Sequence, residues 1–308
     1  MESVAGAAHL FMIRLFSILS AVWMVSVVCL GADAPRVLCF ERGDSVWVAL
    51  LDGTKPKKVA KGYSADISPD GTAVAFNTDE PSKGAPVRHI AIANIATGKV
   101  HVCKGLPSDN CIRPIWSPDG SQLLFQIIAD GDWQLAAIKP DGTDFRYVKK
   151  ADRSGHSFWS ACWAPDGKSF YGQDLDSLCQ FDLNGTELRK WDLHALFPRA
   201  GFSSGARLNV SQDGRTILLD ADLDEDVQRN GWDGPPPSVW TLDLETKTTK
   251  QLTAKDAFCW EPYWLGSDEY VLTQALGKAN ATSIFRQKLG GNDRKLVIKD
   301  GRNPSVSR

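Results

Sequence analysis

The chain has 308 residues, with 35 Lys and Arg against 37 Asp and Glu and a formal net charge of −2 at pH 7. This balance gives no electrostatic reason to bind nucleic acid or an anionic membrane surface, and we expect neither as a partner. The length allows one large domain or two smaller ones.

Residues 1–34 are predicted to form a signal peptide and a short leader. An almost wholly apolar run over 15–30 follows Arg14 and precedes the small residues of 31–34, which is the order of a secretory signal. Met12 is an alternative start. The run is shorter than the ~20 residues that a membrane-spanning helix needs, so no span is expected in the mature chain. A retained membrane anchor is the alternative.

A turn of the form Ser-Pro-Asp-Gly returns at intervals of 47 to 49 residues after the leader. Its copies are Ser68–Gly71, Ser117–Gly120, Ala164–Gly167 and Ser211–Gly214, with a degraded copy at Leu265–Asp268. A fixed period in this range indicates a repeat architecture such as a solenoid or a propeller.

One repeat contains four short apolar runs separated by turns, over 112–117, 122–128, 133–138 and 145–148. Four such strands predict an up-and-down antiparallel sheet. A second turn, Asp141-Gly142 in this repeat, recurs six times, one more than the first turn. The mismatch is resolved if the chain begins on a second strand and ends on a first strand.

We therefore predict an all-β fold, a six-bladed β-propeller of four-stranded antiparallel blades that occupies residues 35–308 as a single domain. The C-terminal strand joins the N-terminal blade and closes the ring, which removes its free edges. The predicted blades cover 36–62 with 303–308, 63–106, 111–152, 158–194, 205–254 and 259–300.

Two connections between strands depart from the repeat. The connection over 191–205 is long enough for a short helical turn. The insertion over 221–237 is acidic and ends in three prolines. We interpret it as a solvated insertion; a calcium site is the alternative, because hard cations bind several oxygen ligands.

The turns, with Trp116 and Trp163 shortly before two of them, resemble the WD40-like repeats of the TolB-type six-bladed propeller. The resemblance covers residues 36–308. It implies a bacterial, periplasmic or secreted propeller that binds an envelope protein or a peptide tail. Members of that family carry an extra N-terminal α/β domain, and here the first blade follows the predicted signal directly, so we expect that domain to be absent.

Aligning the six repeats on the first turn exposes a column, four residues earlier, in which every residue is polar. In propellers of this type the first strand of each blade lines the axis, which predicts a ring at one channel mouth. Six polar residues would share a column by chance roughly once in sixty cases. The column contains Ser64, Arg113, Ser160, Arg207, Glu261 and Asn303.

This ring is the predicted binding site. Arg113 and Arg207 are candidate donors to an anionic ligand such as a carboxylate or a peptide tail. The alternative is that the ends of these strands are hydrated and bind nothing.

We expect a non-catalytic, monomeric binding module without cofactor or metal. The stretch Gly201-Phe202-Ser203-Ser204-Gly205 matches a serine-hydrolase motif, but it lies in a blade connection rather than a strand–turn–helix elbow. The histidines after the leader are dispersed. The alternative function is a propeller enzyme, a polysaccharide lyase or hydrolase with its site at the channel mouth, for which Glu261 is the candidate acid or base.

Six cysteines follow the leader, at 39, 103, 111, 162, 179 and 259. In an exported protein this even number permits disulfides, with Cys103–Cys111 and Cys162–Cys179 as plausible pairs. Buried free thiols are the equal alternative.

Overall fold

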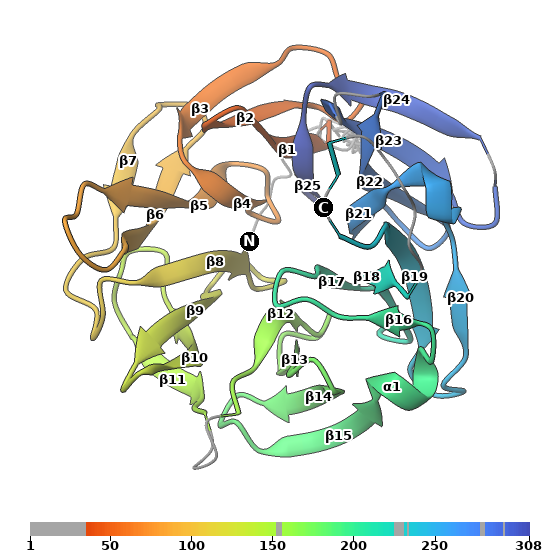
Figure 1. The fold of residues 1–308 in the computed structure, drawn as a ribbon. Coiled ribbons are helices and arrows are strands. Elements are labelled where there is room, and N and C mark those ends of the chain that lie inside the picture. Colours follow the sequence, from red (N-terminus) through yellow and green to blue (C-terminus); the bar gives the residue numbers. More distant parts are fainter. Residues whose placement is uncertain (1–34, 152–155, 225–230, 233, 278–280, 292) are drawn as a thin grey trace, which may run out of the picture. The chain divides into compact units, whose positions relative to one another are not determined.

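The computed structural model describes residues 35–151, 156–224, 231–232, 234–277, 281–291 and 293–308. Within them, six antiparallel sheets surround a common axis and form a six-bladed β-propeller (Figure 1). The predicted signal peptide lies outside the described residues. No helix in the described part of the chain is both long and apolar enough to cross a membrane.

Blades 1 to 3 contain four strands each. In blade 1, β25 (Arg302–Val306) pairs with β1 (Val37–Arg42), followed by β2 (Ser45–Leu50) and β3 (Lys57–Lys61). Blade 2 contains β4 (Tyr63–Ile67), β5 (Ala73–Glu80), β6 (Val87–Asn94) and β7 (Val100–Val102). Blade 3 contains β8 (Cys111–Trp116), β9 (Leu123–Ala129), β10 (Asp132–Ile138) and β11 (Arg146–Lys149).

Blades 4 to 6 follow the same order, with one addition in blade 5. Blade 4 contains β12 (Trp159–Trp163), β13 (Ser169–Gln173), β14 (Ser177–Asp182) and β15 (Glu187–Asp192). Blade 5 contains β16 (Ala200–Gly201), β17 (Leu208–Val210), β18 (Thr216–Leu223), β19 (Pro237–Asp243) and β20 (Thr249–Gln251). Blade 6 contains β21 (Cys259–Trp264), β22 (Glu269–Leu276), β23 (Ala281–Lys288) and β24 (Arg294–Lys299).

The Ser-Pro-Asp-Gly turn joins the first two strands of a blade. In blade 2 the Ser68 hydroxyl donates to Asp70 at 2.6 Å and accepts the backbone N–H of Ala73 at 2.9 Å. Gly71 has a φ of 69°, a left-handed conformation that glycine adopts without steric cost. Ser117 and Ser211 make the same bonds in blades 3 and 5. The recurring motif is therefore a turn that is closed by its own side chains.

The apolar core lies between neighbouring blades. Polar side chains on the first strands also connect the blades, since Asp66 accepts the backbone N–H of Trp116 at 2.9 Å and Asn209 accepts that of Trp264 at 2.7 Å. The six described cysteines are buried free thiols, so the disulfide alternative is not what the structure contains. Burial raises the pKa of Cys111 to about 12, which keeps this thiol protonated.

The predicted closure of the ring is confirmed. Leu38 of β1 pairs with Val306 of β25, and Ser307 donates its backbone N–H to the Val37 carbonyl at 2.9 Å. Figure 1 shows β25 and β1 side by side, at the place where the two ends of the colour scale meet.

The two irregular connections have distinct structures. The predicted helical turn is α1 (Leu193–Leu196), where Asp192 caps the helix by accepting the backbone N–H of Ala195. β16 then pairs with the far end of β18, an addition that the repeat does not predict. A short 3-10 helix, η1 (Lys255–Ala257), precedes blade 6. In the acidic insertion, residues 225–230 and 233 lie outside the described residues, so its predicted character stays a prediction.

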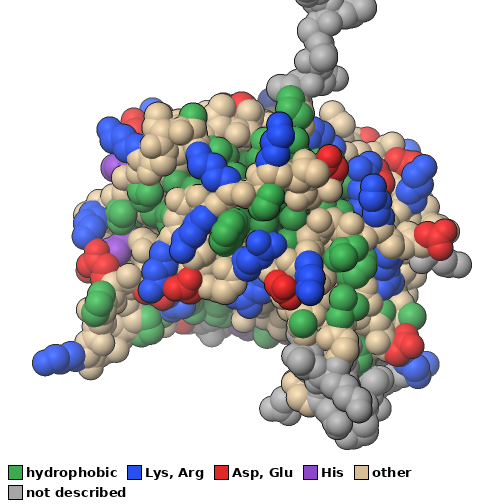
Figure 2. Space-filling model, turned by 90° about the horizontal axis from the view of Figure 1, so that it is seen from above, with side chains coloured by type: hydrophobic (Ala, Val, Ile, Leu, Met, Phe, Trp, Pro, Cys, Tyr) green, Lys and Arg blue, Asp and Glu red, His purple; other side chains and the backbone are tan. Residues whose placement is uncertain are grey.

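Figure 2 views the outer rim of the propeller. Basic, acidic and apolar side chains are interspersed on this face. The side of the rim drawn in Figure 2 therefore carries charges of both signs.

Candidate functional site

The six residues of the predicted ring, called the mouth ring below, line one cavity of about 210 Å³. Each stands at or just before the same point of the first strand of its blade, on β4, β8, β12, β17, β21 and β25. Ser160 is buried and the other five are half-buried. The alignment of the repeats therefore identifies residues that the fold brings together around the axis.

The backbone of the mouth ring is left-handed at five of its six positions, although none of them is glycine. The φ angles are 49° at Ser64, 57° at Arg113, 49° at Ser160, 53° at Glu261 and 51° at Asn303. At each of these residues the pairing with the second strand shifts register, as in a β-bulge. A left-handed residue with a side chain costs roughly 1–2 kcal/mol. Such strain is concentrated at functional sites in proteins, which marks the mouth as a candidate site.

Sequence reasoning missed a second circle of polar residues, on the second strand of each blade. All six are buried, none more than 9% exposed. This second-strand ring consists of Glu41, Asn77, Gln126, Gln173, Asp220 and Thr273. A signal for it exists, because four of these residues stand seven positions after the Asp of a Ser-Pro-Asp-Gly turn or its close variant.

The second-strand ring holds the strained backbone of the mouth ring. Asn77 accepts the backbone N–H of Arg113 at 2.8 Å. Asp220 accepts the N–H of Arg207 at 2.9 Å and that of Glu261 at 3.1 Å. These bonds give the backbone N–H groups of Arg113, Arg207 and Glu261 acceptors, as buried or partly buried donors require.

Arg207 reaches across the axis from blade 5 and contacts side chains of three other residues. Its guanidinium donates to the Asn303 side chain and lies 3.4 Å from an Asp66 oxygen. It also lies 5.3 Å from the centroid of the Tyr263 ring. From the sequence, Arg207 and Arg113 are equal candidates as donors to a ligand. In the structure, Arg207 forms a buried ion pair with Asp66.

The acidic residues near Arg207 are occupied as well. Glu41 accepts from the Asn303 amide at 2.6 Å and lies 3.2 Å from Arg302. Glu261 accepts the backbone N–H of Asn303 at 2.7 Å and the Thr273 hydroxyl at 2.8 Å. We call this network of Arg207, Asp66, Asn303, Glu41 and Glu261 the closed half of the mouth.

Burial shifts the ionisation of three carboxyl groups here. It raises the pKa of Asp66, against the lowering effect of Arg207. Burial also raises the pKa of Glu261, with the neighbouring Glu41 adding to the shift. Burial raises the pKa of Asp220 to about 7, opposed by its two backbone donors. Burial therefore disfavours the charged form of each of these three carboxyl groups.

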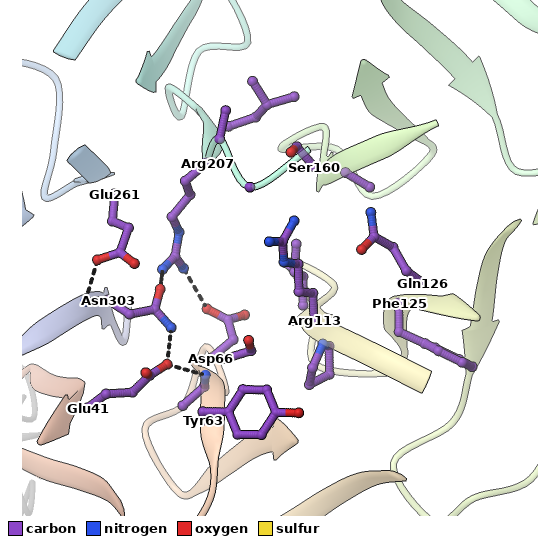
Figure 3. Close-up of a pocket in the computed structure, with 18 of the residues that line it drawn as sticks. Glu41, Tyr63, Asp66, Arg113, Phe125, Gln126, Ser160, Arg207, Glu261 and Asn303 are labelled. Atoms are coloured by element: carbon purple, nitrogen blue, oxygen red, sulfur yellow. Dashed lines mark hydrogen bonds and ion pairs between the residues drawn. The ribbon is translucent and has the colours of Figure 1, made fainter. Parts of the chain in front are cut away.

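Blades 3 and 4 present a different surface, formed by Arg113, Gln126 and Ser160, which we call the open half. Figure 3 shows Arg207 bridged to Asn303 and Asp66, whereas no interaction among the residues drawn reaches Arg113, Gln126 or Ser160. Among the described residues, Arg113 makes no ion pair, and its guanidinium donates only to the backbone carbonyl of Ser204.

Gln126 is the unusual member of the open half. It is 2% exposed and lines the cavity, yet neither its amide nitrogen nor its amide oxygen has a partner among the described residues. A buried polar group without a partner costs about 1–3 kcal/mol. Natural proteins leave few such groups, and each one needs an explanation.

The segment with the serine-hydrolase pattern borders the open half. Ser203 and Ser204 supply backbone carbonyls to Gln173, at 2.8 Å, and to Ser160, at 3.2 Å. The Ser203 hydroxyl accepts the N–H of Gly205, and no helix follows the segment. The segment therefore shapes the mouth and does not form a nucleophile elbow.

No group of three or more His, Cys, Asp or Glu side chains suited to a metal occurs in the described part of the chain. Burial raises the pKa of Asp220 to about 7, but its carboxylate accepts two backbone N–H groups. Asp220 does not line the mouth cavity.

A second cavity, of about 310 Å³, lies further along the first strands toward the turns. It shares Asp66, Ile115, Arg207 and Leu208 with the mouth cavity. The Arg207–Asp66 pair therefore lies where the two cavities meet.

Comparison with known proteins gives partial sequence matches and full-length structural ones. No protein-family model matches the chain. A TolB homologue of Chlorobaculum tepidum is 42% identical over 85 residues, 27% of this chain and 18% of that protein. Dipeptidyl-peptidase 5 of Porphyromonas endodontalis is 28% identical over 92 residues, 29% of this chain and 13% of that protein. The matched segments thus span less than a fifth of these relatives.

Among solved structures, TolB of Acinetobacter baumannii superposes with a TM-score of 0.60 at 19% identity, over 89% of this chain and 66% of that one. A putative TolB of Agrobacterium tumefaciens gives 0.55 at 15% identity, over 88% and 92%. A chain of the nidogen/laminin complex gives 0.62 at 11% identity, over 89% and 98%. At these identities the likeness concerns the fold.

Proposed function

We propose that this chain, which folds as a TolB-like six-bladed β-propeller, is a binding module of the bacterial cell envelope. It is exported to the periplasm or the exterior, and it receives part of a partner protein or a peptide tail at the mouth ring. The binding residues are those of the ring, with Arg113 as the principal donor.

The observation that carries this proposal is the asymmetry of the mouth. An arginine without an ion-pair partner and a buried, unpartnered glutamine line the same cavity. The buried Gln126 amide loses hydration in the folded chain, and the half-buried Arg113 guanidinium has donors without acceptors among the described residues. A bound partner would supply hydrogen bonds to both groups. The strained backbone at the ring adds support, because strain of this kind persists where surrounding structure maintains a functional geometry.

Location in the envelope is supported by the predicted signal peptide and by the similarity to TolB, a periplasmic family. The alternative of a polysaccharide lyase or hydrolase has less support. Its candidate, Glu261, is engaged by the Thr273 hydroxyl and the backbone of Asn303.

The test is affinity capture from a native envelope extract, followed by mass spectrometry, with wild type and Arg113→Ala as baits. We expect a protein that wild type retains and the variant loses. Arg215→Ala is the matched control, because Arg215 is an exposed arginine whose partner is Glu245. Equal capture by all three baits would contradict the proposal, provided that the three melting temperatures agree.

A further inference from the structure

We propose that the ligand of the mouth is a peptide C-terminus. Its terminal carboxylate binds the Arg113 guanidinium, and its last backbone amide binds the Gln126 carboxamide. This inference rests on the binding function proposed above and names the chemical group that the same site selects.

The first argument is the availability of Arg113. A guanidinium has five N–H donors in a planar fork that fits a carboxylate with two parallel bonds. In the described residues its only acceptor is the Ser204 carbonyl. Arg113 therefore has donors left for an anion, whereas Arg207 already holds Asp66 and Asn303.

The second argument is the double character of Gln126. Its side-chain amide offers donors on nitrogen and an acceptor on oxygen, and both atoms are buried without partners. A carboxylate alone would satisfy the nitrogen and leave the oxygen without a donor. A peptide end supplies both an acceptor and a donor. The backbone nitrogen of the last residue, which carries the N–H donor, is two bonds from the carboxylate carbon.

The third argument is the shape of the cavity. Pockets for drug-sized molecules measure roughly 300–1,000 Å³, whereas the mouth cavity measures about 210 Å³. The Arg207–Asp66 pair lies at its inner end, where the second cavity begins. A cavity of this size has room for the end of a peptide rather than for a larger ligand.

The choice between the two ends of a peptide follows from charge. An N-terminal ammonium would need an available carboxylate, and each nearby carboxylate is engaged. Asp66 and Glu41 lie against arginines, and Glu261 accepts two hydrogen bonds. Arg113 is the charged group of the cavity with remaining capacity, and it selects the anionic end.

The experiment uses the full chain and four pools of tripeptides with varied residues. The first pool is N-acetylated with a free C-terminal carboxylate, and the second is the same pool with an amidated C-terminus. The third is acetylated and amidated with a central aspartate, and the fourth has a free N-terminus and an amidated C-terminus. Binding is followed at millimolar peptide by the NMR signal of the Gln126 side-chain amide, which is assigned by its loss in Gln126→Leu.

We expect the free-carboxylate pool to shift the Gln126 signal and to bind at least tenfold more tightly than the other three pools. Arg113→Ala should weaken this binding about 10- to 100-fold, as for loss of a charged hydrogen bond. Calorimetry with Gln126→Leu should show a weakening of about tenfold, and Arg215→Ala should bind as wild type does.

Three outcomes would overturn the inference: equal binding of the amidated pool, preference for the aspartate pool, or no shift with any pool. If capture from the envelope extract still depends on Arg113 in such a case, the proposed function stands without this ligand. If the free-carboxylate pool binds through Arg113 but no extract protein is retained, the ligand inference stands and the envelope function fails.

Discussion

The closed and open halves of the mouth are built on the same repeat position and have opposite properties. In the closed half, Arg207 crosses the axis and is held by Asp66 and Asn303. In the open half, the Arg113 guanidinium donates only to a backbone carbonyl among the described residues. Neither side-chain amide atom of Gln126 has a hydrogen-bond partner there. A shared column in a repeat therefore gives residues a common location, and the neighbouring side chains decide which of them stabilise the fold and which remain available to a ligand.

The largest expected effect tests the closed half. Arg207→Ala leaves Asp66 buried without its cation, and breaking a buried pair costs about 3–5 kcal/mol. We expect the free energy of unfolding, measured in urea, to fall by about this amount. Adding Asp66→Asn should recover part of the loss, because the unpaired charge is then removed. A loss below about 1 kcal/mol would show that Arg207 is as dispensable as a surface residue.

The next effect concerns pH and Asp220. Burial raises its pKa from 3.8 to about 7, so between these values the folded state holds a proton that the unfolded state has released. The folded state binds more protons in this window, and stability therefore falls as pH rises from about 4 to about 7. The upper limit of the fall is on the order of 4 kcal/mol.

Asp220→Asn should remove this part of the pH dependence, since the amide oxygen can still accept from Arg207 and Glu261. The check is urea unfolding of both proteins at several pH values across the window. A wild-type stability that rises over the same interval would contradict the assigned direction.

A smaller effect, of opposite sign, is expected in the open half. Gln126→Leu replaces an unpartnered buried amide by an apolar group of similar size, which should stabilise the fold by about 1 kcal/mol. Gln173→Leu is the matched control, because Gln173 has partners and its loss should destabilise. If both substitutions destabilise equally, Gln126 is bonded within the fold and the two halves do not differ as described.

The smallest stability change is expected for Arg113→Ala. Its side chain has one backbone acceptor and no ion pair among the described residues, so the free energy of unfolding should stay within about 0.5 kcal/mol of wild type. Binding, in contrast, should be lost. A destabilisation as large as that of Arg207→Ala would remove the distinction on which the proposed site depends.

The sequence predicted the fold because its signals are local and repeated. Turns such as Ser68–Gly71 are closed by their own side chains. The second turn of the repeat occurs once more often than the first, and this difference predicted the pairing of β25 with β1. The mouth ring followed from the same alignment, which is why its six members line one cavity.

The roles within the ring were beyond sequence reasoning for physical reasons. Whether an arginine is engaged depends on the reach of its side chain across the axis, as Arg207 shows with Asp66, 141 residues away. The left-handed backbone at Arg113 or Glu261 was also missed, since residue type signals this conformation mainly through glycine. The second-strand ring was detectable in the sequence, at a constant distance after the turns.

The pairing of β1 with β25 also limits when the ring can close during folding. Val37 and Ser307 are hydrogen-bonded although 270 residues separate them. A ribosome adds about 5–20 residues per second, so β25 is synthesised many seconds after β1. During that interval β1 presents an open edge to other chains. The segment over 302–307 thus decides whether the ring closes, and a chain without it would leave β1 without its partner strand.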